Sequence, residues 1–134
     1  MKIEITALAN AVQRLREGPA RCNQQPNDEQ LRGGLIQRFE FTYELSHKAL
    51  RRFLREQSAS PDEIARMPFS DLIRIASEHG LVRAGWPGWR RFRDMRARTS
   101  HVYDAAAALA VVAAIPEFLE EAGYLCDELS RRLR

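Results

Sequence analysis

The sequence feature that most limits the fold of this chain is a long apolar stripe between residues 28 and 57. Its members follow one another at intervals of three or four: Leu31, Leu35, Phe39, Tyr43, Ser46, Leu50 and Phe53. This spacing places them on one face of a helix, and a helix with one apolar face packs against other elements. The stripe therefore predicts a long helix over Asp28–Gln57 that faces other helices.

Helical periodicity continues through most of the chain, and strand signals are almost absent. The other predicted helices are Ile5–Glu17, a short helix that starts at Pro61, Ser70–His79, Gly88–Arg98 and a last helix that reaches Arg132. In the helix Gly88–Arg98 we expect Trp89, Phe92 and Met95 to face inward. These segments predict an all-α fold, arranged as an antiparallel bundle in one domain, residues 1–134.

Several short signals predict where these helices begin and end. Gly18 and Pro19 should end the first helix, and "GWPGW" should form a turn. Ser60 and Glu63 have the spacing of a capping box, and Asp104 is a good N-cap for the last helix. Pro116 should kink that helix.

The Ala-rich stretch Ala105–Ile115 is apolar nearly all round, so we expect burial on more than one side, in the core or at a dimer interface. It is too short to span a bilayer, and the N-terminus has no secretory h-region. We therefore expect a soluble cytoplasmic protein without a membrane partner. The two cysteines and three histidines lie in separate segments, which predicts neither a disulfide nor a metal site.

Charge is concentrated in one segment. Residues 83–98 hold six arginines and one acidic residue, a net charge of +5 in a chain whose total is +3. A local positive field favours an anionic partner, with a nucleic acid or nucleotide first in line. The alternative is a solvated arginine-rich helix face.

The same segment ends in "RDMRARTSHVYD", Arg93–Asp104. On a regular helix, Arg96 and His101 would point about 140° apart, so they share a site only if the helix ends between them. Thr99 and Ser100 favour such an end. An arginine that holds a phosphate and a histidine that moves a proton are the minimum for RNA cleavage without a metal. The alternative is a histidine that interacts with the helix C-terminus.

A polar stripe runs beside the apolar one. It contains Gln37, Glu40, Glu44 and either His47 or Lys48. Glu40 and Glu44 are like charges four residues apart, an unfavourable pair unless cations lie nearby. The stripe is either a solvated face or an ion-paired wall of an arginine-lined cleft.

Three stretches carry a family resemblance: "LIQRFEFTYELSHKALRRFL", "HGLV" and "MRARTSHVYD". Together they resemble the nucleotidyltransferase substrate-binding protein family, a branch of the HEPN superfamily whose toxin members are called HepT. The resemblance implies an up-and-down antiparallel four-helix bundle with an extra short helix, which forms a homodimer. The family commonly has Asn after the motif arginine, where this chain has Ala97, and often an aromatic residue at His47.

The resemblance also implies a function. The chain would be a metal-independent endoribonuclease toxin without a cofactor, acting on RNA through Arg96 and His101. Its partner would be a minimal nucleotidyltransferase (MNT-type) antitoxin that adenylylates Tyr103, which we expect at an accessible bend. The residues expected to line the cleft or bind phosphate are Arg93, Arg98, Ser100, Gln37, Glu40 and Glu44. The alternative is a non-catalytic substrate-binding subunit of a two-component nucleotidyltransferase.

Overall fold

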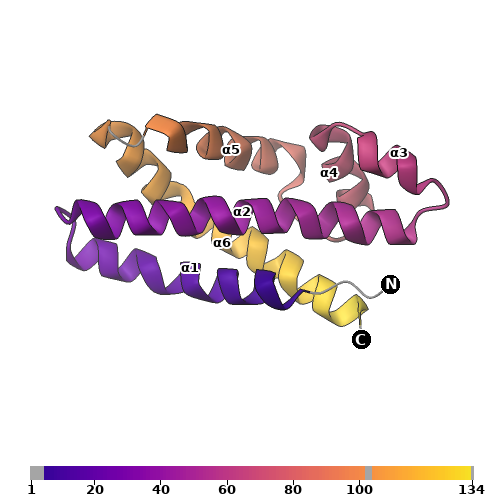
Figure 1. Ribbon diagram of the computed structural model, residues 1–134, viewed down its shortest axis with the longest axis horizontal. Coiled ribbons are helices and arrows are strands. Elements are labelled where there is room, and N and C mark those ends of the chain that lie inside the picture. The colour runs from indigo at the N-terminus through magenta and orange to yellow at the C-terminus, as the bar shows by residue number, and fades with distance from the viewer. Residues whose placement is uncertain (1–4, 102–103, 134) are drawn as a thin grey trace.

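The computed structural model of the chain describes residues 5–101 and 104–133, with only the backbone described at His101. The elements in chain order are α1 (Thr6–Gln24), α2 (Glu29–Gln57), α3 (Pro61–Arg66), α4 (Phe69–Glu78), α5 (Gly85–Arg98), the 3-10 helix η1 (Thr99–His101) and α6 (Ala105–Arg132). Every regular element in these ranges is helical, so the predicted all-α class is confirmed (Figure 1).

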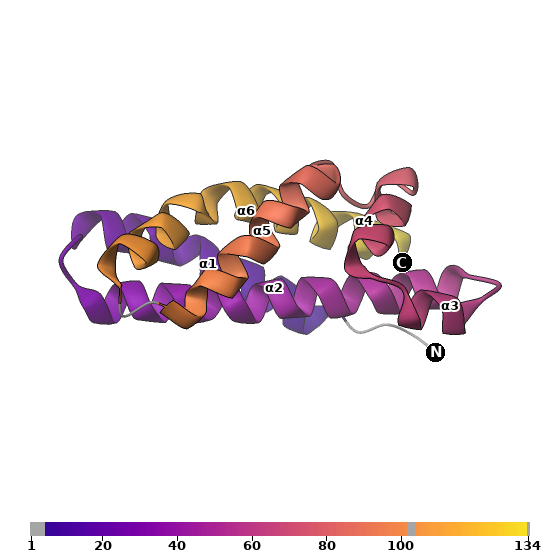
Figure 2. The same cartoon turned by 90° about the horizontal axis from the view of Figure 1, so that it is seen from above.

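The long helix α2 lies at the centre of the arrangement. In Figure 1, α1 lies along one side of α2, and the helices α3, α4 and α5 lie along its other side. The last helix, α6, packs against both α1 and α2. Seen from above, α5 runs obliquely, with its N-terminal end over α6 and its C-terminal end over α2 (Figure 2). The two ends of α5 therefore meet different helices.

The predicted apolar stripe of α2 faces the core. Leu31 is half-buried, and the other six members are buried. The inward residues of α5, Trp89, Phe92 and Met95, are also buried, as predicted. Phe118 of α6 completes the aromatic centre, with its ring 5.0 Å from Phe39 and 5.2 Å from Phe92, both edge-to-face.

The predicted end of the first helix at Gly18 and Pro19 is wrong. The helix continues to Gln24, and Pro19 lies inside it. Gly18 is buried against α2, where an added Cβ would overlap the side chain of Leu35, and Cys22 is buried one turn further on. Packing of this last part of α1 on α2 outweighs the local preference of Gly and Pro to end a helix.

The predicted turn at "GWPGW" is also wrong, because these residues form the first turns of α5. Gly85 has a φ of 63°, so the chain turns into the helix at a residue that tolerates this conformation. Pro87 lies in the first turn, where a backbone N–H would have no helical partner, so its missing donor costs little.

The predicted N-cap of α6 at Asp104 is confirmed, and Asp28, where α2 was predicted to begin, is a second N-cap. Asp28 accepts a hydrogen bond from the Leu31 N–H at 3.0 Å, and Asp104 accepts one from the Ala106 N–H at 2.9 Å. The predicted capping box at Ser60 is wrong, since this side chain makes no cap hydrogen bond. The Ser60 N–H instead donates to Oγ of Ser58, which turns the chain before α3.

A buried carboxylate holds the start of α5. Glu121 of α6 is only 5% exposed, and its Oε1 accepts from the N–H groups of Arg83 and Ala84, at 2.7 and 3.1 Å. The indole Nε1 of Trp89 donates to the same oxygen at 3.2 Å. One side chain thus fixes both the chain that precedes α5 and the first core residue of that helix.

Within one chain, the described residues of the Ala-rich stretch are not buried on more than one side, so the core interpretation is wrong and the dimer-interface interpretation stays a prediction. Ala108, Val111 and Ile115 are buried, but Leu109 is 51% exposed and most of the alanines are exposed or half-buried. The reason is that the buried residues recur at intervals of three and four, so a single face of this half of α6 meets the other helices. None of the described helices is both long and apolar enough to cross a membrane.

Candidate functional site

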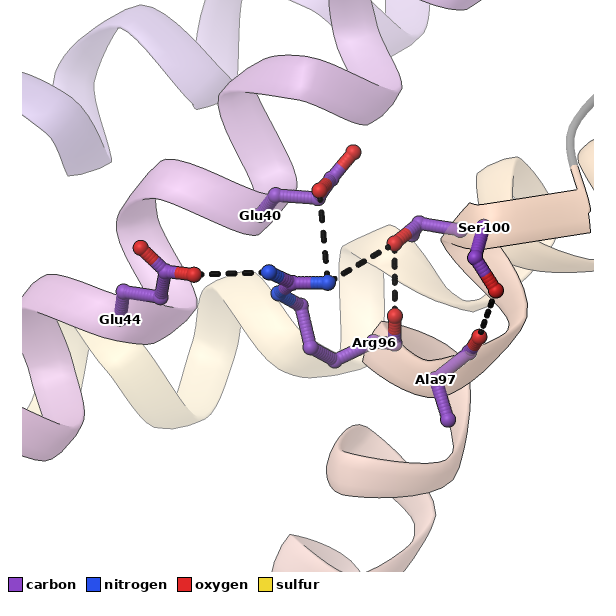
Figure 3. Close-up of polar contacts among 6 residues, drawn as sticks. Glu40, Glu44, Arg96, Ala97 and Ser100 are labelled. Atoms are coloured by element: carbon purple, nitrogen blue, oxygen red, sulfur yellow. Dashed lines mark hydrogen bonds and ion pairs between the residues drawn. The ribbon is translucent and has the colours of Figure 1, made fainter.

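Arg96 lies near the end of α5, and its guanidinium points toward α2 (Figure 3). Its Nη2 donates to Oε1 of Glu44 at 2.7 Å, and its Nη1 lies 3.4 Å from Oε2 of Glu40. The polar stripe was predicted to be either a solvated face or an ion-paired wall. At Glu40 and Glu44 it is ion-paired. They tolerate each other at i,i+4 because one arginine lies against both.

Thr99 fixes the same arginine from its own side. Its buried hydroxyl donates to the Arg96 carbonyl at 2.6 Å, and its Oγ1 accepts from Nη1 of Arg96 at 3.2 Å. Ser100 similarly donates to the carbonyl of Ala97 at 2.9 Å. These bonds occur where α5 gives way to η1, which confirms the predicted helix end between Arg96 and His101.

The cluster is electrostatically coupled. The hydrogen bond from Arg96 lowers the pKa of the Glu44 carboxyl, and the bonds with Glu44 and the charge of Glu40 raise the pKa of Arg96. One cation thus lies between two carboxylates. The Glu44 side chain is 50% exposed and that of Glu40 is 30% exposed, so a phosphate that approaches Arg96 from solvent would first compete with Glu44.

Tyr43 is a neighbour of this cluster that the sequence indicated only as a core residue. Its ring packs among the rings of Phe39, Phe69 and Trp89. Burial raises the pKa of its phenol to about 12, although the charges of Arg93 and Arg96 oppose the shift. Tyr43 therefore remains neutral beneath the arginines at any physiological pH.

The structure does not bring every predicted cleft residue to Arg96. Gln37 lines a separate groove of about 500 Å³ between α1 and α2, together with Arg14 and Phe41. The Arg93 guanidinium lies 5.0 Å from the centre of the Trp86 ring, and Arg98 is exposed. Their roles in substrate binding stay predictions.

The side chain of His101 and the whole of Val102 and Tyr103 lie outside the described residues. The backbone of His101 forms the last residue of η1. The pairing of His101 with Arg96 and the position of Tyr103 at an accessible bend therefore stay predictions.

His47 belongs to the packing between α2 and α4. Its ring centre is 4.1 Å from that of Phe69, and its Nε2 lies 3.1 Å from Nη2 of Arg51. Burial and then the charge of Arg51 lower the pKa of His47 to about 4, so the imidazole is neutral at pH 7. It can accept the hydrogen bond from Arg51 in this form.

The helical arrangement places the chain in a known structural class. It superimposes on a solved protein of Haemophilus influenzae with a TM-score of 0.89 and 33% identity, covering 95% of this chain and 99% of the other. That structure is described as revealing the fold of a substrate binding domain of a nucleotidyltransferase. A solved Thermus thermophilus protein matches with a TM-score of 0.67 and 30% identity, covering 95% and 98% of the two chains.

Sequence comparison agrees with this class. The family described as "Nucleotidyltransferase substrate binding protein like" matches residues 3–131. The chain therefore belongs to the nucleotidyltransferase substrate-binding protein family, and the predicted resemblance is confirmed. A Haemophilus influenzae relative named "Probable ribonuclease HepT" is 42% identical over 99 residues, which are 74% of this chain and 67% of the relative.

Proposed function

We propose that the chain is a HepT-like toxin, a metal-independent endoribonuclease restrained by a minimal nucleotidyltransferase antitoxin. The observation that carries the proposal is Arg96, held at the end of α5 by Glu40, Glu44 and Thr99 and followed by a break in the helix before His101. The name of the 42% identical relative supports the same activity.

In the proposed reaction, His101 takes the proton from a 2′-hydroxyl, and the freed oxygen attacks the adjacent phosphorus. The P–O5′ bond breaks, and the leaving oxygen takes a proton from an acid, which yields a cyclic phosphate and a 5′-hydroxyl. Arg96 stabilises the negative charge that develops on the phosphate oxygens. Its pre-formed bonds to α2 and Thr99 hold the guanidinium in place, so that little reorganisation is needed.

The proposal includes a homodimer of up-and-down four-helix bundles, each a single domain. Two Arg96/His101 pairs that face one shared cleft would double the positive field around a bound RNA strand. The exposed apolar face around Leu109 supplies a surface on which a second protein could pack. Sedimentation at micromolar concentration tests the dimer, and a monomer alone would contradict it.

The activity is tested by RNA cleavage in EDTA. The wild type should cleave, and Arg96→Ala and His101→Ala should not. Arg90→Ala is the matched control, because Arg90 is an exposed arginine of the same helix. If the wild type leaves RNA intact in EDTA, the nuclease proposal is wrong.

Regulation by the partner centres on Tyr103. Its phenol oxygen would attack the α-phosphate of ATP, forming a Tyr–AMP phosphodiester, with loss of the phenolic proton and release of pyrophosphate. The added negative charge would occupy Arg96 and exclude an RNA phosphate. Incubation with the nucleotidyltransferase, ATP and magnesium should add AMP to this chain, and an addition that persists in Tyr103→Phe would contradict the assignment.

A second candidate is a non-catalytic substrate-binding subunit of a two-component nucleotidyltransferase. Its support is the description of the solved relative and the presence of two carboxylates on Arg96. This candidate predicts a stable complex with the nucleotidyltransferase and no RNA cleavage. The EDTA assay therefore separates the two.

A further inference from the structure

A second hollow begins at the Arg96 cluster and follows α2 away from it. It has a volume of about 1040 Å³, and Glu44 lines its first end. Its floor is the α2 surface as far as Glu56, and Ser58 and Pro61 form a wall at the start of α3. We call it the α2–α3 groove. Because Glu44 also accepts from Arg96, the groove and the candidate site share this residue.

The lining of the α2–α3 groove is basic. It contains four cations, Lys48, Arg51, Arg52 and Arg55, and two carboxylates. Both carboxylates have arginine partners, since Glu44 binds Arg96 and Glu56 lies 3.8 Å from Nε of Arg52. The negative charge of the lining is therefore largely compensated, and the groove presents a positive field.

Arg51 builds the wall of this groove. Its Nη1 donates to the carbonyls of Ile64 and Met67 at 2.9 and 3.0 Å, which ties the end of α3 to α2. The His47 ring next to Arg51 is packed on Phe69. The groove is therefore a built feature, with one of its arginines committed to holding its shape.

Lys48 and Arg55 are the cations that remain available. Both are exposed, and neither has an ion pair within the described residues. They are seven residues apart, so they lie on the same face of α2, two turns or about 10 Å from each other. Lys48 is one turn from Glu44 and hence from Arg96. The row of positive charge thus leads directly away from the candidate site.

The chemistry of the groove fits a polyanion better than a protein. Protein interfaces have an apolar or aromatic centre, but the large apolar side chains exposed in the described residues, Phe41 and Leu109, do not line this groove. A chain of phosphates needs a positive track that follows its backbone. The α2–α3 groove has this property.

We propose that the α2–α3 groove binds the phosphate backbone of the RNA strand on one side of the scissile bond, with Lys48 and Arg55 as its phosphate contacts. This inference rests on the proposed function, because it assigns an RNA strand to the Arg96 site. It makes Lys48 and Arg55 determinants of affinity and of the length of RNA that the protein prefers.

The test is the binding of a fluorescent single-stranded uridine oligonucleotide of about twelve residues. Anisotropy is measured with the full chain carrying His101→Ala, which prevents cleavage during the titration. The double variant with Lys48→Gln and Arg55→Gln is compared with a double variant with Arg16→Gln and Arg21→Gln. The control removes the same charge from exposed positions of α1, which lies on the opposite side of α2 from α3 (Figure 1).

Loss of two phosphate contacts should weaken binding about tenfold at roughly 0.2 M salt and reduce the salt slope by about 1.4. The control should stay within about twofold of the parent, because its residues do not line the groove. If non-specific charge alone caused the loss, both pairs would weaken binding equally. The difference between the pairs should shrink as the oligonucleotide is shortened. In cleavage assays, Lys48→Gln with Arg55→Gln should raise KM for long RNA more than it lowers kcat.

Equal affinity and salt slope for the two pairs would overturn the inference. If His101→Ala still abolishes cleavage in that case, the proposed function stands while the groove assignment falls. If Lys48→Gln with Arg55→Gln retains RNA binding but loses the complex with the nucleotidyltransferase, the groove docks a protein and the inference is wrong. Absence of both RNA binding and cleavage in the wild type would remove the proposed function itself.

Discussion

The two ends of α5 are each held by carboxylates of another helix, in opposite surroundings. At the N-terminal end, the buried Glu121 accepts three N–H groups from the chain around it. At the C-terminal end, Arg96 meets Glu44 and Glu40 at the surface. The first arrangement shuts out water and any competing ligand. The second leaves both partners accessible, so a phosphate can replace a carboxylate there with little loss of stability.

The largest expected effect is at the buried end. Glu121→Ala leaves one buried and two partly buried donors without their acceptor and should lower the free energy of unfolding by about 4 kcal/mol. Urea denaturation followed by circular dichroism measures it. Glu121→Gln, which keeps an amide oxygen, is the control and should lose less. A loss below about 1 kcal/mol in the alanine variant would show that the two ends of α5 do not differ as described.

The exposed end should show its effect in activity. Arg96→Gln removes the charged fork and, under the proposed function, should reduce kcat/KM for RNA by about 100- to 1000-fold. The melting temperature should change little, because a surface ion pair contributes little stability. Arg90→Gln is the control for both measurements. A large fall in melting temperature with Arg96→Gln would mean that this end of α5 is structural as well.

The half-buried imidazole of His47 should make stability depend on pH. The pKa of His47 is about 4 in the folded chain, against an ordinary value of 6.5. Between these values the unfolded chain binds the extra proton, so stability should decrease as pH falls from about 6.5 to 4. The decrease should be on the order of 1–2 kcal/mol after allowance for partial exposure. His47→Phe should remove this part of the pH dependence in thermal unfolding, and His79→Phe, at an exposed position, is the control.

The smallest effect is expected at Glu44. Its pKa is lowered by Arg96, so its contribution to stability is present above about pH 4.5 and is lost as pH falls through the lowered pKa. Glu44→Gln should cost at most about 0.5 kcal/mol at pH 7, because the pair is exposed. By freeing Arg96 from one competitor, it should strengthen RNA binding modestly in the anisotropy assay. Weaker RNA binding would show that the positioning of Arg96 by Glu44 matters more than the competition of Glu44 with phosphate.

The sequence predicted those parts of the fold that depend on periodicity within one helix. The stripe of α2 and the Asp104 cap of α6 fall into this class, since each signal is local. The continuation of α1 through Pro19 and the helical conformation of "GWPGW" were mispredicted. Both depend on contacts with other segments, namely the burial of Gly18 against Leu35 and the hydrogen bonds to Glu121. Local preference is a small energy that such contacts can exceed.

In the candidate site, too, local signals were predicted and contacts between segments were not. Two glutamates four residues apart indicated that a cation was needed nearby, and an arginine of α5 meets them. Which arginine does so, and that Tyr43 lies beneath it, depends on how α5 crosses α2. The hydroxyl of Thr99 that accepts from Arg96 was missed for a different reason, since the threonine was taken only as a helix-ending residue. A side chain three residues after an arginine at a helix end can reach back to it.

The close approach of α1 to α2 at Gly18 has a consequence for mutational scanning. Every other residue would bring a Cβ into the end of the Leu35 side chain, so substitutions at this position should lower stability, and larger side chains should lower it most. Under the proposed function, a survey that measured toxicity alone would count these losses of stability together with the loss of activity at Arg96, although Gly18 does no chemistry. The two kinds of position can be told apart with Leu35→Ala. This smaller neighbour makes room for alanine at position 18, so the stability lost in Gly18→Ala should be partly recovered in the double variant.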